Sequence, residues 1–179
     1  MLESSEILDV GCGNIPKTTP WGHTKRGTIG IDIKRGKADI VADAQALPLK
    51  DNSFEKVVSF FLIEHVLNVE KAIREMIRVS RNEVIIATDN ALFYRVQLLR
   101  LLGNKTSFQQ EEHVYAFFPF QMKHFLTRTG IAKMVKRCYV RTCNVTPLHK
   151  LDKIMLALSR FIPTLRSLVY GHIVVHIIK

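Results

Sequence analysis

The hydrophobic positions in the first half of the chain follow two spacings, one typical of buried strands and the other typical of helices. Mostly apolar stretches of strand length lie at 7–10, 57–62 and 83–88. Residues 68–79 instead repeat apolar side chains at the i, i+3, i+4 spacing of one helix face, and Asn68 is the expected N-cap. Because strands and helices alternate in this half, we predict a parallel sheet with right-handed crossovers.

The second half of the chain is expected to add further helices and the last two strands. The helices are predicted at 92–102, 119–129 and 151–158, and the strands at 133–143 and 169–178. Gly130 follows the second of these helices, at the position where glycine commonly ends a helix. Prolines and glycines interrupt residues 14–28 so often that a loop or a single turn is predicted there.

Charge is distributed unevenly along the sequence. Residues 1–112 carry 15 Lys+Arg and 15 Asp+Glu, whereas residues 113–179 carry 11 basic residues and one acid, Asp152. The C-terminal segment therefore holds the whole formal net charge of +10. A positive field of this kind favours an anionic partner, either nucleic acid, an anionic lipid surface or an acidic protein. The alternative is a solvated basic face that keeps the protein soluble.

Length and composition describe one ordinary globular domain over residues 1–179. The chain is 47% hydrophobic and 23% charged, and it is long enough to bury a core. It contains neither a run of the roughly 18–20 apolar residues that span a membrane nor a signal-peptide pattern at its acidic N-terminus. Its three cysteines lack the spacing of a disulfide framework or a zinc site, so we expect no metal and a cytoplasmic location. The oligomeric state, monomer or homo-oligomer, is left open.

The turn after the first strand carries the clearest chemical signal. The run Asp-Val-Gly-Cys-Gly at 9–13 follows a buried strand, and its two glycines allow a tight turn and a close approach of a ligand to the backbone. A dinucleotide-binding turn would need a third glycine at position 16, where Pro16 stands. A nicotinamide-dependent oxidoreductase is therefore disfavoured. The acid before the first glycine also suits an amine better than a phosphate.

The run at 9–13 resembles the first motif of the class I S-adenosylmethionine-dependent methyltransferases, in particular the small type-11-like domains. The run Gly-Ile-Asp at 30–32 resembles the second strand of that family, and 39–44 the third strand with its turn. Residues 54–59, followed by Glu-His-Val at 64–66, resemble the fourth strand and the segment that faces the methionine moiety. The resemblance implies a Rossmann-like α/β fold: a doubly wound, mostly parallel seven-stranded sheet with its last strand antiparallel and helices on both faces.

The resemblance also implies S-adenosyl-L-methionine as the cofactor and assigns roles to the acids. Asp9 would bind the ammonium group, Asp32 the ribose hydroxyls and Asp43 the adenine amine. The rings of Phe60 and Phe61 would line the sulfonium, because an aromatic face attracts a cation. The expected cofactor-binding set is Asp9, Gly11, Cys12, Gly13, Asn14, Asp32, Ile33, Asp43, Ala44, Phe60, Phe61 and His65.

No residue is identified as the catalytic base. His65, His113 and Tyr115 are the candidates, because an imidazole titrates near neutral pH and a phenol donates and accepts hydrogen bonds. Many methyl transfers need no base. The Asn-Pro-Pro-Tyr type of motif that amino-methylating nucleic-acid enzymes carry after the fourth strand is replaced by Phe-Phe-Leu-Ile at 60–63. Nucleobase methylation therefore receives no direct support.

Two functions remain open. The first is a methyltransferase with a cofactor-binding half at 1–88 and a substrate-side half at 89–179, acting on an acceptor that the basic segment suggests is anionic (RNA, lipid or protein). The second is a catalytically inactive methyltransferase-like module that binds RNA or a partner protein. The interrupted stretch at 14–28, where a crossover helix is expected, motivates this alternative. The methyl acceptor is not indicated by the sequence.

Overall fold

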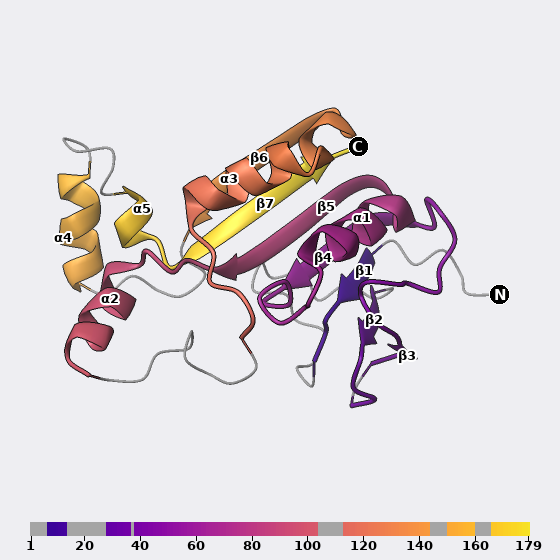
Figure 1. Cartoon of the computed structure of the whole chain (residues 1–179), viewed down its shortest axis with the longest axis horizontal. Coiled ribbons are helices and arrows are strands. Elements are labelled where there is room, and N and C mark those ends of the chain that lie inside the picture. The colour runs from indigo at the N-terminus through magenta and orange to yellow at the C-terminus, as the bar shows by residue number, and fades with distance from the viewer. Residues whose placement is uncertain (1–6, 14–27, 37, 104–112, 144–149, 160–165) are drawn as a thin grey trace.

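The computed structural model describes residues 7–13, 28–36, 38–103, 113–143, 150–159 and 166–179. These residues form one seven-stranded sheet in the order β3-β2-β1-β4-β5-β7-β6 (Figure 1). The strands are β1 (Ile7–Val10), β2 (Thr28–Asp32), β3 (Ile40–Val41), β4 (Phe54–Phe60), β5 (Ser80–Asp89), β6 (Arg137–Cys143) and β7 (His172–Ile178). Strands β1 to β5 pair in parallel, and β7 runs antiparallel to both of its neighbours. The predicted sheet, with an antiparallel last strand, is confirmed.

The helices are α1 (Val69–Val79), α2 (Tyr94–Leu101), α3 (Pro119–Arg128), α4 (Lys150–Leu158) and α5 (Arg166–Val169). Helices α1 and α3 lie on the same face of the sheet (Figure 1). Strand β7 alternates fully buried Ile173, Val175 and Ile177 with half-buried residues. Strand β1 is buried at all four positions, and three of its four residues are apolar.

Helix α1 has both the buried face and the N-cap that the sequence predicts. Its buried side chains lie on the predicted face and pack against β4 and β5. The side-chain oxygen of Asn68 accepts a hydrogen bond of 2.9 Å from the backbone N–H of Lys71, so the expected N-cap is confirmed.

Three expected elements differ in extent or in burial. Strand β6 begins only at Arg137, because Gly130 (φ 74°) starts a short 3-10 helix instead of a strand. Strand β7 begins only at His172, because residues 166–169 form α5. The apolar helix expected at 92–102 is present as α2, yet none of its residues is buried.

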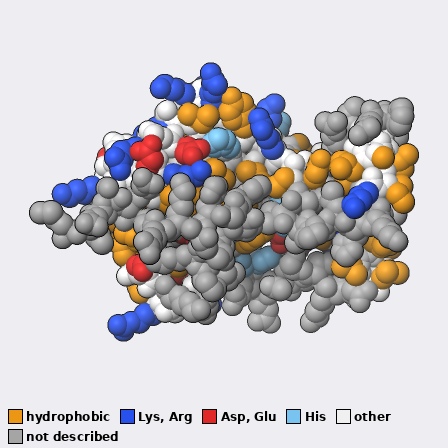
Figure 2. Space-filling model, turned by 180° about the vertical axis from the view of Figure 1, so that it is seen from behind, with side chains coloured by type: hydrophobic (Ala, Val, Ile, Leu, Met, Phe, Trp, Pro, Cys, Tyr) orange, Lys and Arg blue, Asp and Glu red, His pale blue; other side chains and the backbone are white. Residues whose placement is uncertain are grey.

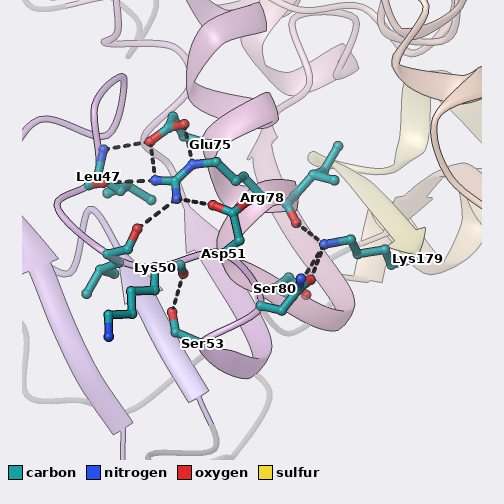
Figure 3. Close-up of polar contacts among 11 residues, drawn as sticks. Leu47, Lys50, Asp51, Ser53, Glu75, Arg78, Ser80 and Lys179 are labelled. Carbon is teal, nitrogen blue, oxygen red and sulfur yellow. Dashed lines mark hydrogen bonds and ion pairs between the residues drawn. The ribbon is translucent and has the colours of Figure 1, made fainter.

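A cluster around Arg78 joins α1 to the loop after β3 (Figure 3). The Arg78 guanidinium donates to both carboxylate oxygens of Glu75, at 2.7 and 2.8 Å, and to Asp51 at 2.7 Å. It also donates to the backbone carbonyls of Leu47 and Leu49. Its hydrogen bonds hold the pKa of Glu75 below its ordinary value. Because Leu47 closely follows Asp43, Arg78 fixes the loop that leads from the third strand.

Lysine in place of Arg78 is expected to lower the free energy of unfolding by about 1–2 kcal/mol, because an ammonium cannot make the bidentate pair and reach both carbonyls. Urea denaturation measures the change. The matched control is Arg81→Lys, because Arg81 donates only a long 3.5 Å hydrogen bond, to the carbonyl of Ser53, among the described residues. Equal effects of the two substitutions would show that the Arg78 cluster does not contribute to stability.

Candidate cofactor-binding site

Backbone hydrogen bonds join the turn after β1 to the end of β2. Residues Asp9 and Val10 pair with Gly30 and Ile31 in the sheet. Beyond the strand, the N–H groups of Gly11 and Cys12 both donate to the carbonyl of Ile31, at 2.8 and 3.1 Å. The turn therefore lies at the carboxyl edge of two neighbouring parallel strands, which is where open α/β sheets bind ligands.

Asp32 links the end of β2 to this turn. Its Oδ2 atom accepts a 2.8 Å hydrogen bond from the N–H of Gly13, and its Oδ1 atom accepts one of 2.8 Å from the N–H of Lys34. Each carboxylate oxygen can accept a further hydrogen bond, because an ionised carboxyl group offers about four acceptor positions. Asp32 is thus fixed in orientation and keeps acceptor capacity toward a ligand.

The electrostatic environment of the turn is negative. Burial, and then the negative charges of Asp9, Asp32 and Asp39, raise the pKa of the Cys12 thiol to about 11. Asp39, which the sequence analysis did not select, is held by a 2.7 Å hydrogen bond from the N–H of Gly30. Carboxylates that converge on one point favour a positively charged ligand.

A cavity of about 280 Å³ lies beside this turn. It is slightly smaller than typical ligand pockets of about 300–1,000 Å³. Six predicted residues line it: Gly11, Asp32, Ile33, Asp43, Ala44 and His65. Seven other residues complete the lining, and the sequence analysis did not select them: Val10, Ile31, Ala42, Gln45, Leu62, Val66 and Leu67.

The other described residues of the predicted set, Asp9, Cys12, Gly13, Phe60 and Phe61, are not part of this lining. Asp9 is 9% exposed at the end of β1, next to the turn. Phe60 lies in β4, and the ring of Phe61 packs edge-on against His172, with ring centroids 5.4 Å apart. Asn14 lies outside the described residues.

Gln45 donates hydrogen bonds to the carboxylate of Asp43. The Gln45 side-chain amide donates to both oxygens of Asp43, at 3.1 Å each, and its backbone N–H donates to Oδ1 at 2.8 Å. The side-chain oxygen of Gln45 accepts from the N–H of Asn68, the N-cap of α1. The signal that could have identified Gln45 is its place two residues after Asp43, where a side chain commonly bonds back across a turn.

Leu62 fills the space above Gly11. A Cβ atom built on Gly11 would lie 2.8 Å from the Leu62 Cβ and 2.9 Å from both of its terminal methyl groups. A Cβ atom built on Gly13 would meet nothing within 4 Å. The open side of the glycine turn is therefore at Gly13.

The three candidates for a catalytic base lie close together. The imidazole rings of His65 and His113 meet edge to face, with centroids 4.5 Å apart. The hydroxyl of Tyr115 donates to the carbonyl of Leu67 at 2.8 Å, and its backbone N–H donates to the carbonyl of Glu64. The segment that begins at His113 therefore packs onto the loop after β4, which carries part of the cavity lining.

Glu64 is a buried carboxyl group that the sequence analysis did not select. Its exposed fraction is 1%, and its Oε2 atom accepts a 3.0 Å hydrogen bond from the hydroxyl of Thr88. Its Oε1 atom has no hydrogen-bond partner among the described residues. Burial raises the pKa of Glu64 to about 7.

Besides this site, the described residues contain a second, larger cavity but neither a cluster of metal-binding side chains nor a helix able to span a membrane. Within them, His, Cys, Asp and Glu do not gather in groups of three that could hold a metal ion. A larger cavity of about 350 Å³, between α3 and β6, contains none of the predicted site residues. None of the helices in these ranges is long and apolar enough to cross a bilayer.

Methyltransferases are among the known proteins whose sequences are similar to this chain. The profile of the family described as "Methyltransferase domain" matches residues 8–88. An uncharacterised protein of Methanocaldococcus jannaschii is 32% identical over 101 residues, which are 51% of this chain and 39% of that protein. A demethylmenaquinone methyltransferase of Renibacterium salmoninarum is 27% identical over 137 residues, which are 64% of this chain and 58% of that enzyme. The chain thus spans less than two thirds of the length of both relatives.

Solved structures extend the likeness to nearly the whole chain. An S-adenosylmethionine-dependent methyltransferase of Thermotoga maritima superposes with a TM-score of 0.63 at 15% sequence identity. The superposition covers 97% of this chain and 81% of the Thermotoga chain. At this identity the likeness is one of fold.

Proposed function

We propose that this chain, which has the fold of the class I S-adenosylmethionine-dependent methyltransferases, binds S-adenosylmethionine at the carboxyl edge of β1, β2 and β3 and transfers its methyl group. The observation that carries the proposal is the convergence of Asp9, Asp32 and Asp39 on the turn around Cys12, beside a cavity that Asp32 and Asp43 line. A cationic adenosyl compound with an ammonium group and a ribose diol fits such a donor set.

Each group of the proposed site has a defined task. Asp32, oriented by its bonds to the N–H groups of Gly13 and Lys34, accepts hydrogen bonds from the ribose hydroxyls. Asp9 attracts the ammonium group through its charge. The Asp43 carboxylate, which Gln45 now engages, exchanges part of that contact for the adenine amine. Leu62 moves away from Gly11 or bounds the methionine end of the site.

When bound, S-adenosylmethionine supplies a methyl group on a positively charged sulfur, which is already activated for displacement. The chain therefore has to align the acceptor and exclude water. His65 lines the cavity and the ring of His113 meets it edge to face, which supports this pair as the group that receives a proton leaving the acceptor.

A binding module without catalytic activity is the second candidate, and two contacts favour it. Gln45 engages both oxygens of Asp43, and Leu62 covers Gly11, so the chain's own atoms take two of the expected cofactor contacts. Such a module would bind its RNA or protein partner without a cofactor.

Calorimetric titration with S-adenosylhomocysteine separates the two candidates. The methyltransferase proposal expects saturable binding by the wild-type protein and about 10–100-fold weaker binding by Asp32→Asn, because a charged acceptor of the ribose hydroxyls is lost. Asp51→Asn is the control, because Asp51 is an exposed carboxylate held by Arg78 and lies outside the cavity lining. No heat of binding with either S-adenosylhomocysteine or S-adenosylmethionine would reject the methyltransferase and leave the binding module.

A further inference from the structure

One end of the molecule exposes an unusual number of large apolar side chains. Helix α2 contributes Leu98, Leu99 and Leu101, which are 49%, 44% and 83% exposed, and Leu102 at its end is 66% exposed. Helix α4 adds Ile154 and Leu158, at 57% and 49%. Both helices lie at the same end of the molecule, away from β1 to β4 (Figure 1). We call this surface the α2–α4 end.

The apolar side chains gather instead of being scattered. Viewed from behind, several groups of hydrophobic side chains lie at the right-hand end of the molecule, with a basic group near them (Figure 2). Single exposed leucines are ordinary on a protein surface, but a contiguous patch marks a place of interaction. Helix α2 presents its leucines to solvent, and α4 presents Ile154 and Leu158.

The charges on these helices are mainly positive. Helix α2 contains Arg95 and Arg100 and no acid. The sequence of α4 has Lys150 and Lys153 against the single acid Asp152. A surface that combines exposed leucines with arginine and lysine matches two features of a bilayer boundary, an apolar interior and anionic headgroups.

We propose that the α2–α4 end docks on an anionic lipid bilayer. The leucines of α2, with Ile154 and Leu158 of α4, enter the boundary between headgroups and acyl chains, and the arginines of α2 contact lipid phosphates. A second copy of this chain is a poorer occupant, because an isologous contact would bring like charges together. Nucleic acid is poorer too, because a phosphate backbone offers the cations a partner but leaves the leucines exposed.

The connections of these helices give the docked molecule an orientation. Helix α2 follows β5, and α5 leads into β7, which is antiparallel to β5. Both therefore meet the sheet at the carboxyl edge of the parallel strands, the edge that carries the cavity beside Gly11 and Asp32. Docking would turn this edge toward the bilayer. The docking itself does not depend on the proposed methyltransferase activity.

Cosedimentation with lipid vesicles tests the proposal. The full chain is expected to bind vesicles of phosphatidylcholine with phosphatidylglycerol at least about tenfold more strongly than vesicles of phosphatidylcholine alone. The double substitution Leu98→Asp and Leu101→Asp is expected to reduce this binding by about tenfold or more. The control is Val41→Asp, compared with Leu101→Asp alone, because it places the same single charge on a 53% exposed apolar position of β3, far from the α2–α4 end (Figure 1).

Other outcomes overturn the docking. They are an absence of vesicle binding, equal loss with Val41→Asp, or a dimer in sedimentation velocity that the double substitution turns into a monomer. RNA binding that depends on these leucines while vesicle binding does not would overturn it as well. Calorimetry with S-adenosylhomocysteine on the double variant keeps this result separate from the proposed function, because cofactor binding should be unchanged.

Discussion

Alanine in place of Gly11 is expected to lower the free energy of unfolding by about 2–4 kcal/mol. Gly11 has a φ of +79°, a left-handed conformation that costs an L-residue about 1 kcal/mol or more. Its new Cβ atom would also lie 2.8 Å from the Cβ of Leu62, and overpacking of this kind costs about 1–3 kcal/mol. Relief requires the backbone at Leu62 to move, because the nearest atom is not the far end of a side chain. Urea denaturation measures the loss.

Gly13→Ala is the matched control for this substitution. Gly13 has a φ of +57°, and a Cβ atom there meets nothing within 4 Å, so only the conformational cost of about 1 kcal/mol is expected. The difference between the two variants isolates the contact with Leu62. A double-mutant cycle with Leu62→Gly should show a coupling of about 1–2 kcal/mol. Equal losses at Gly11 and Gly13, without coupling, would mean that Leu62 does not lie over the turn.

The fold could be predicted where the burial of an element determines the spacing of its apolar residues. Strand β1 is buried on both faces, so apolar residues occupy three of its four positions, Ile7, Leu8 and Val10. Helix α1 is buried on one face, so its apolar residues recur at helical spacing after the cap at Asn68. The glycine turn and Asp32 could be selected because they follow directly from the ends of such strands.

The contacts made by side chains within loops could not be predicted in this way. Phe61 has a φ of +54°, a conformation that a bulky residue rarely adopts, and its ring faces His172. No pattern in the sequence predicts such a turn, and the place of Phe61 beside the sulfonium stays a prediction. The contact of Leu62 with Gly11 arises in the same loop and depends on the same backbone path.

The exposure of α2 shows the same limit at a larger scale. A run of leucines at helical spacing predicts a helix, and α2 is a helix. Spacing alone does not tell whether another element covers the apolar side chains, because coverage depends on residues distant in the sequence. The leucines of α2 are exposed among the described residues, and this exposure is what suggests a lipid partner.

Glutamine in place of Glu64 is expected to remove a pH dependence of stability. Burial raises the pKa of Glu64 from its ordinary value of 4.5 to about 7. The folded state therefore keeps a proton that the unfolded state loses. As the pH rises from about 4.5 through about 7, the wild-type protein should lose about 3 kcal/mol of unfolding free energy to this group alone, with no penalty at lower pH. A glutamine side chain is neutral throughout this range, so Glu64→Gln should be the more stable protein above neutral pH and nearly equal to the wild type near pH 4.5.

Glu75→Gln is the control of opposite sign. The hydrogen bonds from Arg78 lower the pKa of Glu75, so its contribution to stability is present above about pH 4.5 and is lost as the pH falls further. The measurement is urea denaturation of the three proteins at a series of pH values. Relative to the wild type, Glu64→Gln should gain stability as the pH rises, whereas Glu75→Gln should lose it. If the difference in unfolding free energy between the wild type and Glu64→Gln does not change with pH, Glu64 ionises as an ordinary carboxyl group and is therefore hydrated. Water would then reach the loop on which His65 and His113 meet.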